Sequence, residues 1–258
     1  MMSSIKQIKS FSAKNLISEN THYLLLEGDL NENLYDEVSS IEFKVSKQWV
    51  YEDTEFNDEK EHGPLLVELD AEHKLLNHFI SHWSQQHMGV IISTQESIET
   101  LIQHLLDLRY VTIPNGDPLQ KVLFRWYEPR QFVGLLKGFD DRDISYFMSP
   151  ITSISWCEWA YDQGLWYQVI KPEIENVPDF SPKFEITQVM IESMDKQDEK
   201  YFVREVTREL IDEHPDLLKK GSEKALDASI LKQTRLAISK GIDRRNNIKE
   251  FIYKKLNA

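Results

Sequence analysis

The chain has 258 residues, which is enough for one large domain or two smaller ones with a sizeable core. Its net charge of −13 argues against a general nucleic-acid binder, because neutralising phosphates requires a basic surface. No apolar run approaches the ~20 residues that span a bilayer, and the N-terminus lacks the apolar core of a secretory signal. The single cysteine, Cys157, excludes an internal disulfide and is typical of a reducing compartment. We therefore expect a cytoplasmic protein without membrane insertion.

The first 150 residues alternate between apolar runs of strand length and amphipathic stretches of helical period. Strands are expected at residues 22–27, 65–69, 90–92 and 122–126. Helices are expected at residues 31–40, 71–85 (with Asp70 as N-cap), after a cap at Ser93 or Thr94, and at 129–137. An acidic loop at 51–63 and a turn at 114–117 separate some of them. This alternation favours an α/β lobe with a parallel or mixed sheet flanked by helices.

The rest of the chain follows a different pattern. Residues 151–171 carry several tryptophans around a turn at 162–164, which predicts a hairpin at the edge of a sheet. Pro172, Pro178 and Pro182 then indicate a linker. Further helices are expected at 197–212, 222–240 and 246–256. The predicted domains are an α/β lobe at 1–150, the aromatic hairpin and linker at 151–182, and an all-helical C-terminal lobe at 183–258.

Charge is unevenly distributed along the chain. Residues 1–150 contain 13 Lys/Arg and 24 Asp/Glu, whereas residues 219–258 contain 11 Lys/Arg and 4 Asp/Glu. Solvated helix faces would account for this difference. The alternative is that the basic end docks on an acidic partner or on the chain's own acidic lobe.

The most constrained stretch is LFRWYEPR at residues 123–130, where a short apolar run stops at a proline and a helix begins. Pro129 suits the first turn of a helix, because its missing N–H would have no partner there. Arg125 and Arg130 flank Glu128, so bidentate ion pairs are expected to lock this corner. Direct contact of these side chains with a partner is the alternative.

Four more motifs precede this block in a fixed order: YLLLEG (23–28), PLLVELD (64–70), MGVIIS (88–93) and LIQHLLDLR (101–109). The ordered set resembles the domain of unknown function 4123 (DUF4123) family, over about residues 20–150. Glu128 stands where the family usually has aspartate, and Trp126 where another aromatic residue is common. The stretch LAISKGI at residues 236–242 also resembles the family.

The resemblance implies an adaptor chaperone of bacterial type VI secretion, which binds an effector and helps to load it onto the spike protein VgrG. Such a role is stoichiometric and requires no catalytic residue, cofactor or metal. Specificity for the effector would lie mainly in the C-terminal lobe, so removing residues 183–258 is expected to abolish effector binding and leave the N-terminal lobe folded.

The alternative is an uncharacterised α/β enzyme with an acidic or histidine site. His73, His78, His82 and His87 cluster in one predicted helix and its exit, and His78 and His82 have the spacing of two metal ligands on one face. No third ligand is placed by the sequence, and solvated helix positions explain them as well. Cys157 has no evident histidine base, and the carboxylates at 68, 70, 140, 141 and 143 single out no acid–base pair.

Tryptophans form the last candidate group, because they either fill a core between lobes or present an aromatic interface. The residues expected to bind a partner or organise the lobes are therefore Arg125, Trp126, Tyr127, Glu128, Arg130, Trp156, Trp159 and Trp166.

Overall fold

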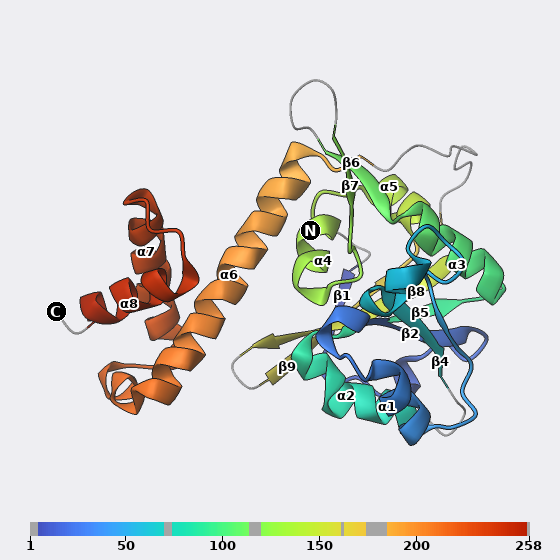
Figure 1. The fold of residues 1–258 in the computed structure, drawn as a ribbon, viewed down its shortest axis with the longest axis horizontal. Coiled ribbons are helices and arrows are strands. Elements are labelled where there is room, and N and C mark those ends of the chain that lie inside the picture. The colour runs from blue at the N-terminus through green and yellow to red at the C-terminus, as the bar shows by residue number, and fades with distance from the viewer. Residues whose placement is uncertain (1–4, 70–73, 114–119, 161–162, 174–184, 257–258) are drawn as a thin grey trace. The chain divides into compact units, whose positions relative to one another are not determined.

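The structure of the chain is a computed structural model that describes all residues except 1–4, 70–73, 114–119, 161–162, 174–184 and 257–258. The described chain divides into two compact units, Met1–Met194 (unit 1) and Asp195–Ala258 (unit 2). Figure 1 traces its helices and strands in chain order. No helix in the described ranges is long and apolar enough to cross a membrane.

Unit 1 is built on a seven-stranded sheet. Its strands are β1 (Ile5–Ile8), β2 (Thr21–Glu27), β3 (Lys47–Trp49), β4 (Pro64–Glu68), β5 (Gly89–Thr94), β8 (Ile151–Ala160) and β9 (Gln163–Ile170). Their order across the sheet is β1-β9-β8-β5-β2-β4-β3. A separate two-stranded sheet pairs β6 (Tyr110–Ile113) with β7 (Gln120–Leu123).

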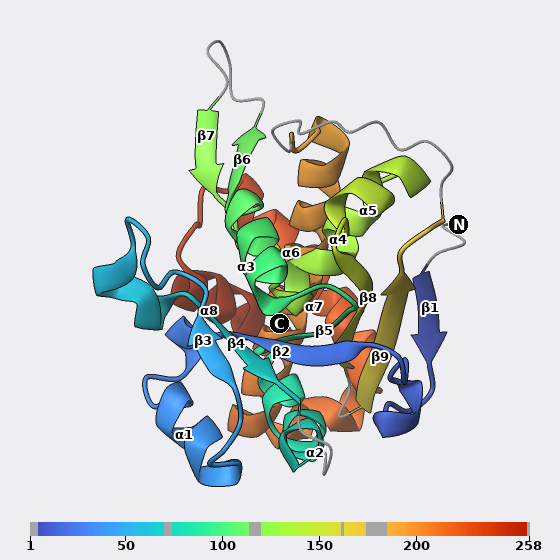
Figure 2. The same ribbon diagram turned by 90° about the vertical axis from the view of Figure 1, so that its right-hand side faces the viewer.

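Helices cover both faces of the large sheet (Figure 2). On one face lie α1 (Leu34–Ile41) and α2 (Lys74–Ser81), and on the other lie α3 (Ile98–Asp107), α4 (Pro129–Leu136) and α5 (Asp141–Phe147). Because side chains alternate along a strand, β2 sends Leu24 and Leu26 into one core cluster and Tyr23 and Leu25 into the other. This layered arrangement confirms the predicted α/β lobe flanked by helices.

The predicted parallel or mixed strand direction is wrong, because all pairings between the described strands are antiparallel. Strands β4 and β5 do run the same way and are joined through α2, as in a crossover unit. However, β2 lies between them and pairs with both. The alternation of strand and helix in the sequence was therefore real, but it could not show that an earlier strand separates the two parallel ones.

The tryptophan hairpin is confirmed but is not at the edge of the sheet. Strand β8 pairs with β5 on one side and β9 on the other, and β1 covers the outer side of β9. The strand β1 carries only two apolar residues, Ile5 and Ile8, so its short sequence gave no recognisable strand pattern.

Several boundaries differ from the sequence prediction. The cap of α3 is Ser97, whose side chain accepts a hydrogen bond from the backbone of Thr100, rather than Ser93 or Thr94, which belong to β5. The predicted strand 122–126 ends earlier, at Leu123, whereas the helix starting at Pro129 is confirmed. Asp70, the turn 114–117, and Pro178 and Pro182 lie outside the described residues.

Unit 2 is all helical, as predicted for the C-terminal region. It contains most of α6 (Gln188–Glu213), followed by α7 (Glu223–Ser239) and α8 (Arg245–Leu256). Its core is a single cluster of mostly aliphatic residues: Val203, Val206, Leu210, Leu217, Ile230, Ala237, Ile248 and Ile252. Helix α6 starts nine residues earlier than the predicted position 197, and its first residues belong to unit 1, where Met190 is buried in the core with Ile186.

Candidate functional site

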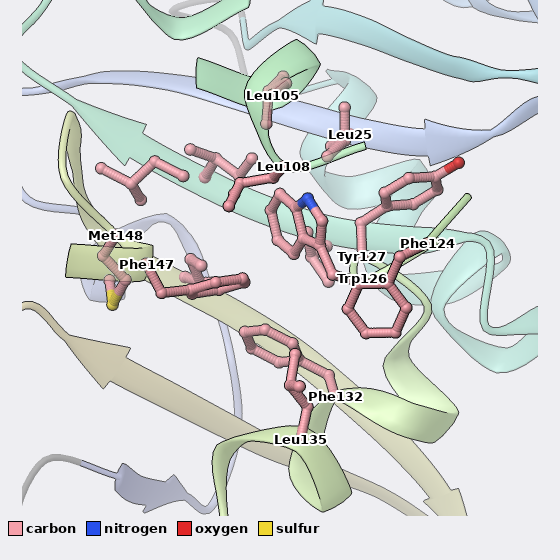
Figure 3. Close-up of a cluster of buried hydrophobic side chains, with 14 of the residues drawn as sticks. Leu25, Leu105, Leu108, Phe124, Trp126, Tyr127, Phe132, Leu135, Phe147 and Met148 are labelled. Atoms are coloured by element: carbon pink, nitrogen blue, oxygen red, sulfur yellow. The ribbon is translucent and has the colours of Figure 1, made fainter. Parts of the chain in front are cut away.

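The aromatic residues of the block at 123–130 point into the core of unit 1. Trp126 and Tyr127 are 2% and 3% exposed. The Trp126 ring packs edge-on against Phe147, at 5.1 Å between ring centroids, and also contacts Phe132 of α4 (Figure 3). Aromatic pairs at such distances stabilise a core beyond the area that they bury. Trp126 therefore packs between the start of α4 and α5.

The charged residues of the same block form ion pairs within unit 1. Arg125 contacts Asp29 at 2.5 Å and Glu27 at 3.5 Å, and both carboxylates lie at or just after the end of β2. Arg130 in the first turn of α4 pairs with Glu128, the residue that precedes the helix. A charged arginine that links two carboxylates fixes the chain entering α4 against the end of β2.

Burial shapes the electrostatics of this network. Burial raises the pKa of Glu27, and the positive charge of Arg125 only partly offsets this effect. Burial also raises the pKa of the Tyr127 hydroxyl well above its usual value, and the nearby Glu27 carboxylate raises it further. For Asp29, burial is outweighed by the hydrogen bond and charge of Arg125, helped by His62, so its pKa is lowered. Arg125 thus contacts two carboxyl groups, Glu27 and Asp29, whose pKa values are shifted in opposite directions.

The other motifs also serve the fold. In YLLLEG, a Cβ added at Gly28 would lie 2.1 Å from the carbonyl oxygen of Glu61, so only glycine fits there. In MGVIIS, Gly89 has a φ of +155° and would place a Cβ 2.0 Å from the carbonyl oxygen of Leu25. In LIQHLLDLR, His104 Nε2 donates to the carbonyl of Phe147 at 2.8 Å, and Arg109 pairs with Glu55 at 3.1 Å. Each of these three motifs joins two segments of unit 1.

The tryptophans of the hairpin lie in two separate clusters on opposite faces of the sheet. Trp156 is fully buried and stacks on Tyr167, with 5.6 Å between ring centroids. Trp166 is 5% exposed and stacks on Phe11 at 4.7 Å. Neither forms part of an exposed aromatic surface. The side chain of Trp159 lies outside the described residues.

The residues considered for an enzyme site have ordinary structural contacts. His78 and Trp83 both contact Glu37 Oε1, at 3.2 and 3.1 Å, and His78 stacks on His82. Within the described residues, no group of three or more His, Cys, Asp or Glu side chains is placed to hold a metal ion; His73 lies outside them. Burial raises the pKa of the Cys157 thiol to about 12, so it stays protonated at neutral pH.

A surface cleft that the sequence gave no reason to expect lies at the opposite end of the sheet from β1. It has a volume of about 350 Å³ and is bordered by the start of α1, by β3 and by η3, the short helix Asn57–His62. Its lining residues come from the start of α1, from β3 and from the acidic segment 51–63, for which the sequence predicts an exposed loop. The sequence did not predict the cleft because β3, which borders it, has only three residues and shows no strand pattern.

Residues 22–146 of the chain match the family model described as domain of unknown function (DUF4123). This stretch is a DUF4123 domain. The match confirms the family resemblance and covers β2 to α5, which contain all five motifs. No curated protein and no solved structure matches the chain.

Proposed function

We propose that the chain is a cytoplasmic adaptor chaperone of bacterial type VI secretion, which binds an effector and helps to load it onto the spike protein VgrG. The observation that carries the proposal is the DUF4123 match, together with the ordered motifs inside it. The motif side chains bind one another within unit 1, which leaves other surfaces for partners. Such a protein acts by reversible, stoichiometric binding rather than by turnover.

Unit 2 is the proposed effector-binding part. It lies outside the matched residues 22–146, so the family domain does not dictate its surface. Helix α7 carries two apolar side chains at the surface, Leu236 (38% exposed) and Ile238 (56% exposed). The two side chains lie on either side of the buried Ala237, so each offers a separate apolar contact for a segment of the cargo.

Co-purification tests the proposal. The full chain is expressed with the effector and the spike protein encoded beside its gene, and the mixture is separated by size exclusion. We expect the chain to elute with the effector, and the two together to elute with the spike protein. Separate elution of all three proteins, from a folded chain, would contradict the adaptor function.

A matched pair of variants locates the effector surface. Ile238→Asp changes an isoleucine of unit 2 that is 56% exposed, and Ile170→Asp changes one of unit 1 that is 47% exposed. We expect Ile238→Asp to weaken effector binding about tenfold or more, which corresponds to about 1.4 kcal/mol, and Ile170→Asp to leave it unchanged. Equal effects of the two variants would argue against unit 2 as the effector-binding part.

A further inference from the structure

The cleft beside β3 combines an open strand edge with an acidic lining. Among the strands that the structure describes, β3 pairs with β4 alone and is the last strand of its sheet, as Figure 2 shows. Glu68 N donates to Ser46 O, and Val50 N donates to Pro64 O, both at 2.9 Å. Because the hydrogen-bonding direction alternates along a strand, the backbone N–H groups of Lys47 and Trp49 point away from β4.

The residues that line the cleft indicate that it runs along the outer edge of β3, on the side away from β4. Lys47 and Trp49 project from one face of β3 and Gln48 from the other, yet all three border the cleft. One wall is the start of α1, with Tyr35 stacked on Trp49 at 6.3 Å between ring centroids. The other wall includes Lys60 and its ion-pair partner Glu52, whose charged atoms lie 2.6 Å apart. An extended chain laid along β3 would therefore run between two walls.

The lining is rich in carboxylates. Four of them (Glu32, Asp36, Glu52 and Glu61) face two lysines (Lys47 and Lys60), so the cleft is net negative. Lys60 pairs with Glu52, and the Lys47 ammonium lies 4.1 Å from the centre of the Tyr35 ring and bonds to Ser39 Oγ. A cleft of one charge sign attracts ligands of the opposite sign and excludes ligands of the same sign.

An aromatic side chain of the lining adds to this surface. Tyr35 borders the cleft and is 43% exposed. An exposed aromatic ring beside an acidic cleft suits a ligand that alternates cationic and apolar side chains. The strand itself offers few backbone groups, so the charges and this ring would provide most of the selectivity.

We propose that this cleft binds an extended segment of a partner protein in which Lys or Arg alternates with apolar residues. The segment pairs with the outer edge of β3, its cations contact the carboxylates of the cleft, and an apolar side chain packs on Tyr35. This inference rests on the proposed adaptor function only in assigning the segment to a partner. The basic unit 2 of a second copy is a poorer occupant, because Arg235, Arg245 and Lys249 already pair with carboxylates of α6.

Defined peptides test the chemistry of the ligand. Fluorescence anisotropy with the full chain compares three labelled hexapeptides: Lys-Val-Lys-Val-Lys-Val, Glu-Val-Glu-Val-Glu-Val, and the Lys-Val peptide with N-methylated backbone amides. We expect the unmodified Lys-Val peptide to bind at least about tenfold more tightly than either of the others, and more weakly as salt is raised. Equal binding of the Lys-Val and Glu-Val peptides would overturn the proposal.

Two matched pairs of variants test the location. Glu32→Lys with Glu61→Lys reverses two exposed carboxylates of the cleft, and Glu19→Lys with Glu173→Lys reverses two exposed carboxylates elsewhere in unit 1. Lys47→Pro removes an outward N–H, which an edge strand tolerates, whereas Lys47→Ala retains it. We expect the cleft reversal and Lys47→Pro each to weaken binding about tenfold, and neither control to weaken it. Circular dichroism confirms that each variant is folded.

The outcomes separate this proposal from the adaptor function. Loss of peptide binding in the cleft variants, with no effector or spike complex, would retain the cleft and remove the adaptor function. A stable effector complex, with no Lys-Val peptide binding by the full chain, would remove the cleft proposal and retain the adaptor. A dimer of the chain that dissociates when the cleft charges are reversed would identify a second copy as the occupant and overturn the proposal.

Discussion

Units 1 and 2 are held together by different interactions. In unit 1, aromatic residues from several elements fill a core on each side of the sheet, and all six tryptophans of the chain lie in this unit. In unit 2, a small aliphatic core is accompanied by ion pairs at the surface, such as Arg235–Glu199 and Arg245–Glu209. The first kind of interaction depends on exact side-chain shape, whereas the second tolerates many substitutions.

This difference explains where a family pattern can be recognised. Gly28, Gly89, Trp126 and Arg125 occupy places where close contacts leave little choice of residue. Three cations of residues 219–258, Arg235, Arg245 and Lys249, pair with carboxylates of α6 at the surface, where many substitutions are tolerated. A recognisable domain is therefore expected in unit 1, and a surface adapted to one partner in unit 2 or in the cleft.

The largest effect on stability is expected when the chain is truncated after residue 182 rather than after residue 196. The sequence alone predicted that residues 1–182 fold without the rest, but this chain lacks Ile186 and Met190, which are buried in the core of unit 1. A chain of residues 1–196 retains them. Each lost side chain costs about 2–5 kcal/mol. We expect cooperative urea unfolding, followed by tryptophan fluorescence, for residues 1–196 and a much lower midpoint or no transition for residues 1–182. Equal midpoints would mean that the first turn of α6 is not part of unit 1.

Two glycine-to-alanine substitutions, one in each unit, compare how closely the units are packed, because each adds a single methyl group. Gly28→Ala in unit 1 pushes a methyl group against the backbone of residues 61–63, and we expect a loss of several kcal/mol. Gly241→Ala in unit 2 meets no atom within 4 Å but must adopt a φ of +77°, which costs about 1 kcal/mol. Tryptophan fluorescence follows unit 1, and helical circular dichroism includes unit 2. A milder effect at Gly28 than at Gly241 would contradict the close packing.

His104 gives unit 1 a dependence on pH. Burial lowers its pKa in the folded chain, although its bond to Phe147 opposes this effect. Below about pH 6.5 the unfolded chain therefore binds more protons, and stability falls as the pH falls towards the folded pKa. Between pH 7 and 5, His104→Gln should lose less stability than the wild type, by about 1 kcal/mol in urea unfolding. His82→Gln, at an exposed histidine, is the control, and an identical pH dependence of the wild type and His104→Gln would refute the assignment.

The smallest effect is expected from the ion pairs of unit 2. Arg245 contacts Glu205 at 2.9 Å and Glu209 at 2.5 Å, but its side chain is 41% exposed. We expect Arg245→Gln to cost less than about 1 kcal/mol, and high salt to reduce even this loss. Thermal unfolding by circular dichroism, with Arg244→Gln as the neighbouring control, measures it. A loss of several kcal/mol that is insensitive to salt would show that the pair is a main support of unit 2.

Local patterns in the sequence predicted the elements better than their pairing. The helix at Pro129 and the pair of strands β8 and β9 follow from proline geometry and from aromatic runs beside a predicted turn. The antiparallel sheet did not follow, because the insertion of β2 between β4 and β5 depends on long-range contacts. Short strands such as β3 have too few residues for a period to be detected.

The candidate site was predictable only in part. The pairing of Glu128 with Arg130 follows from their spacing, but the Arg125 partners Glu27 and Asp29 are almost one hundred residues away. Trp156 and Trp166 gave the same aromatic signal, yet they lie on opposite faces of the sheet. The cleft depends on three segments meeting at the sheet edge, which no single motif encodes.

Hydrogen exchange of the free chain, followed by mass spectrometry, most directly tests the claim that the block at residues 123–130 organises unit 1 rather than waits for a partner. If the claim is right, the amides of Phe124 and Glu128, which donate to the carbonyls of Arg109 and Arg125, exchange only when unit 1 unfolds globally, at the same free energy as the buried strand β5. Rapid exchange of this block in the free chain, with β5 still protected, would contradict the claim and make the block a partner-binding segment.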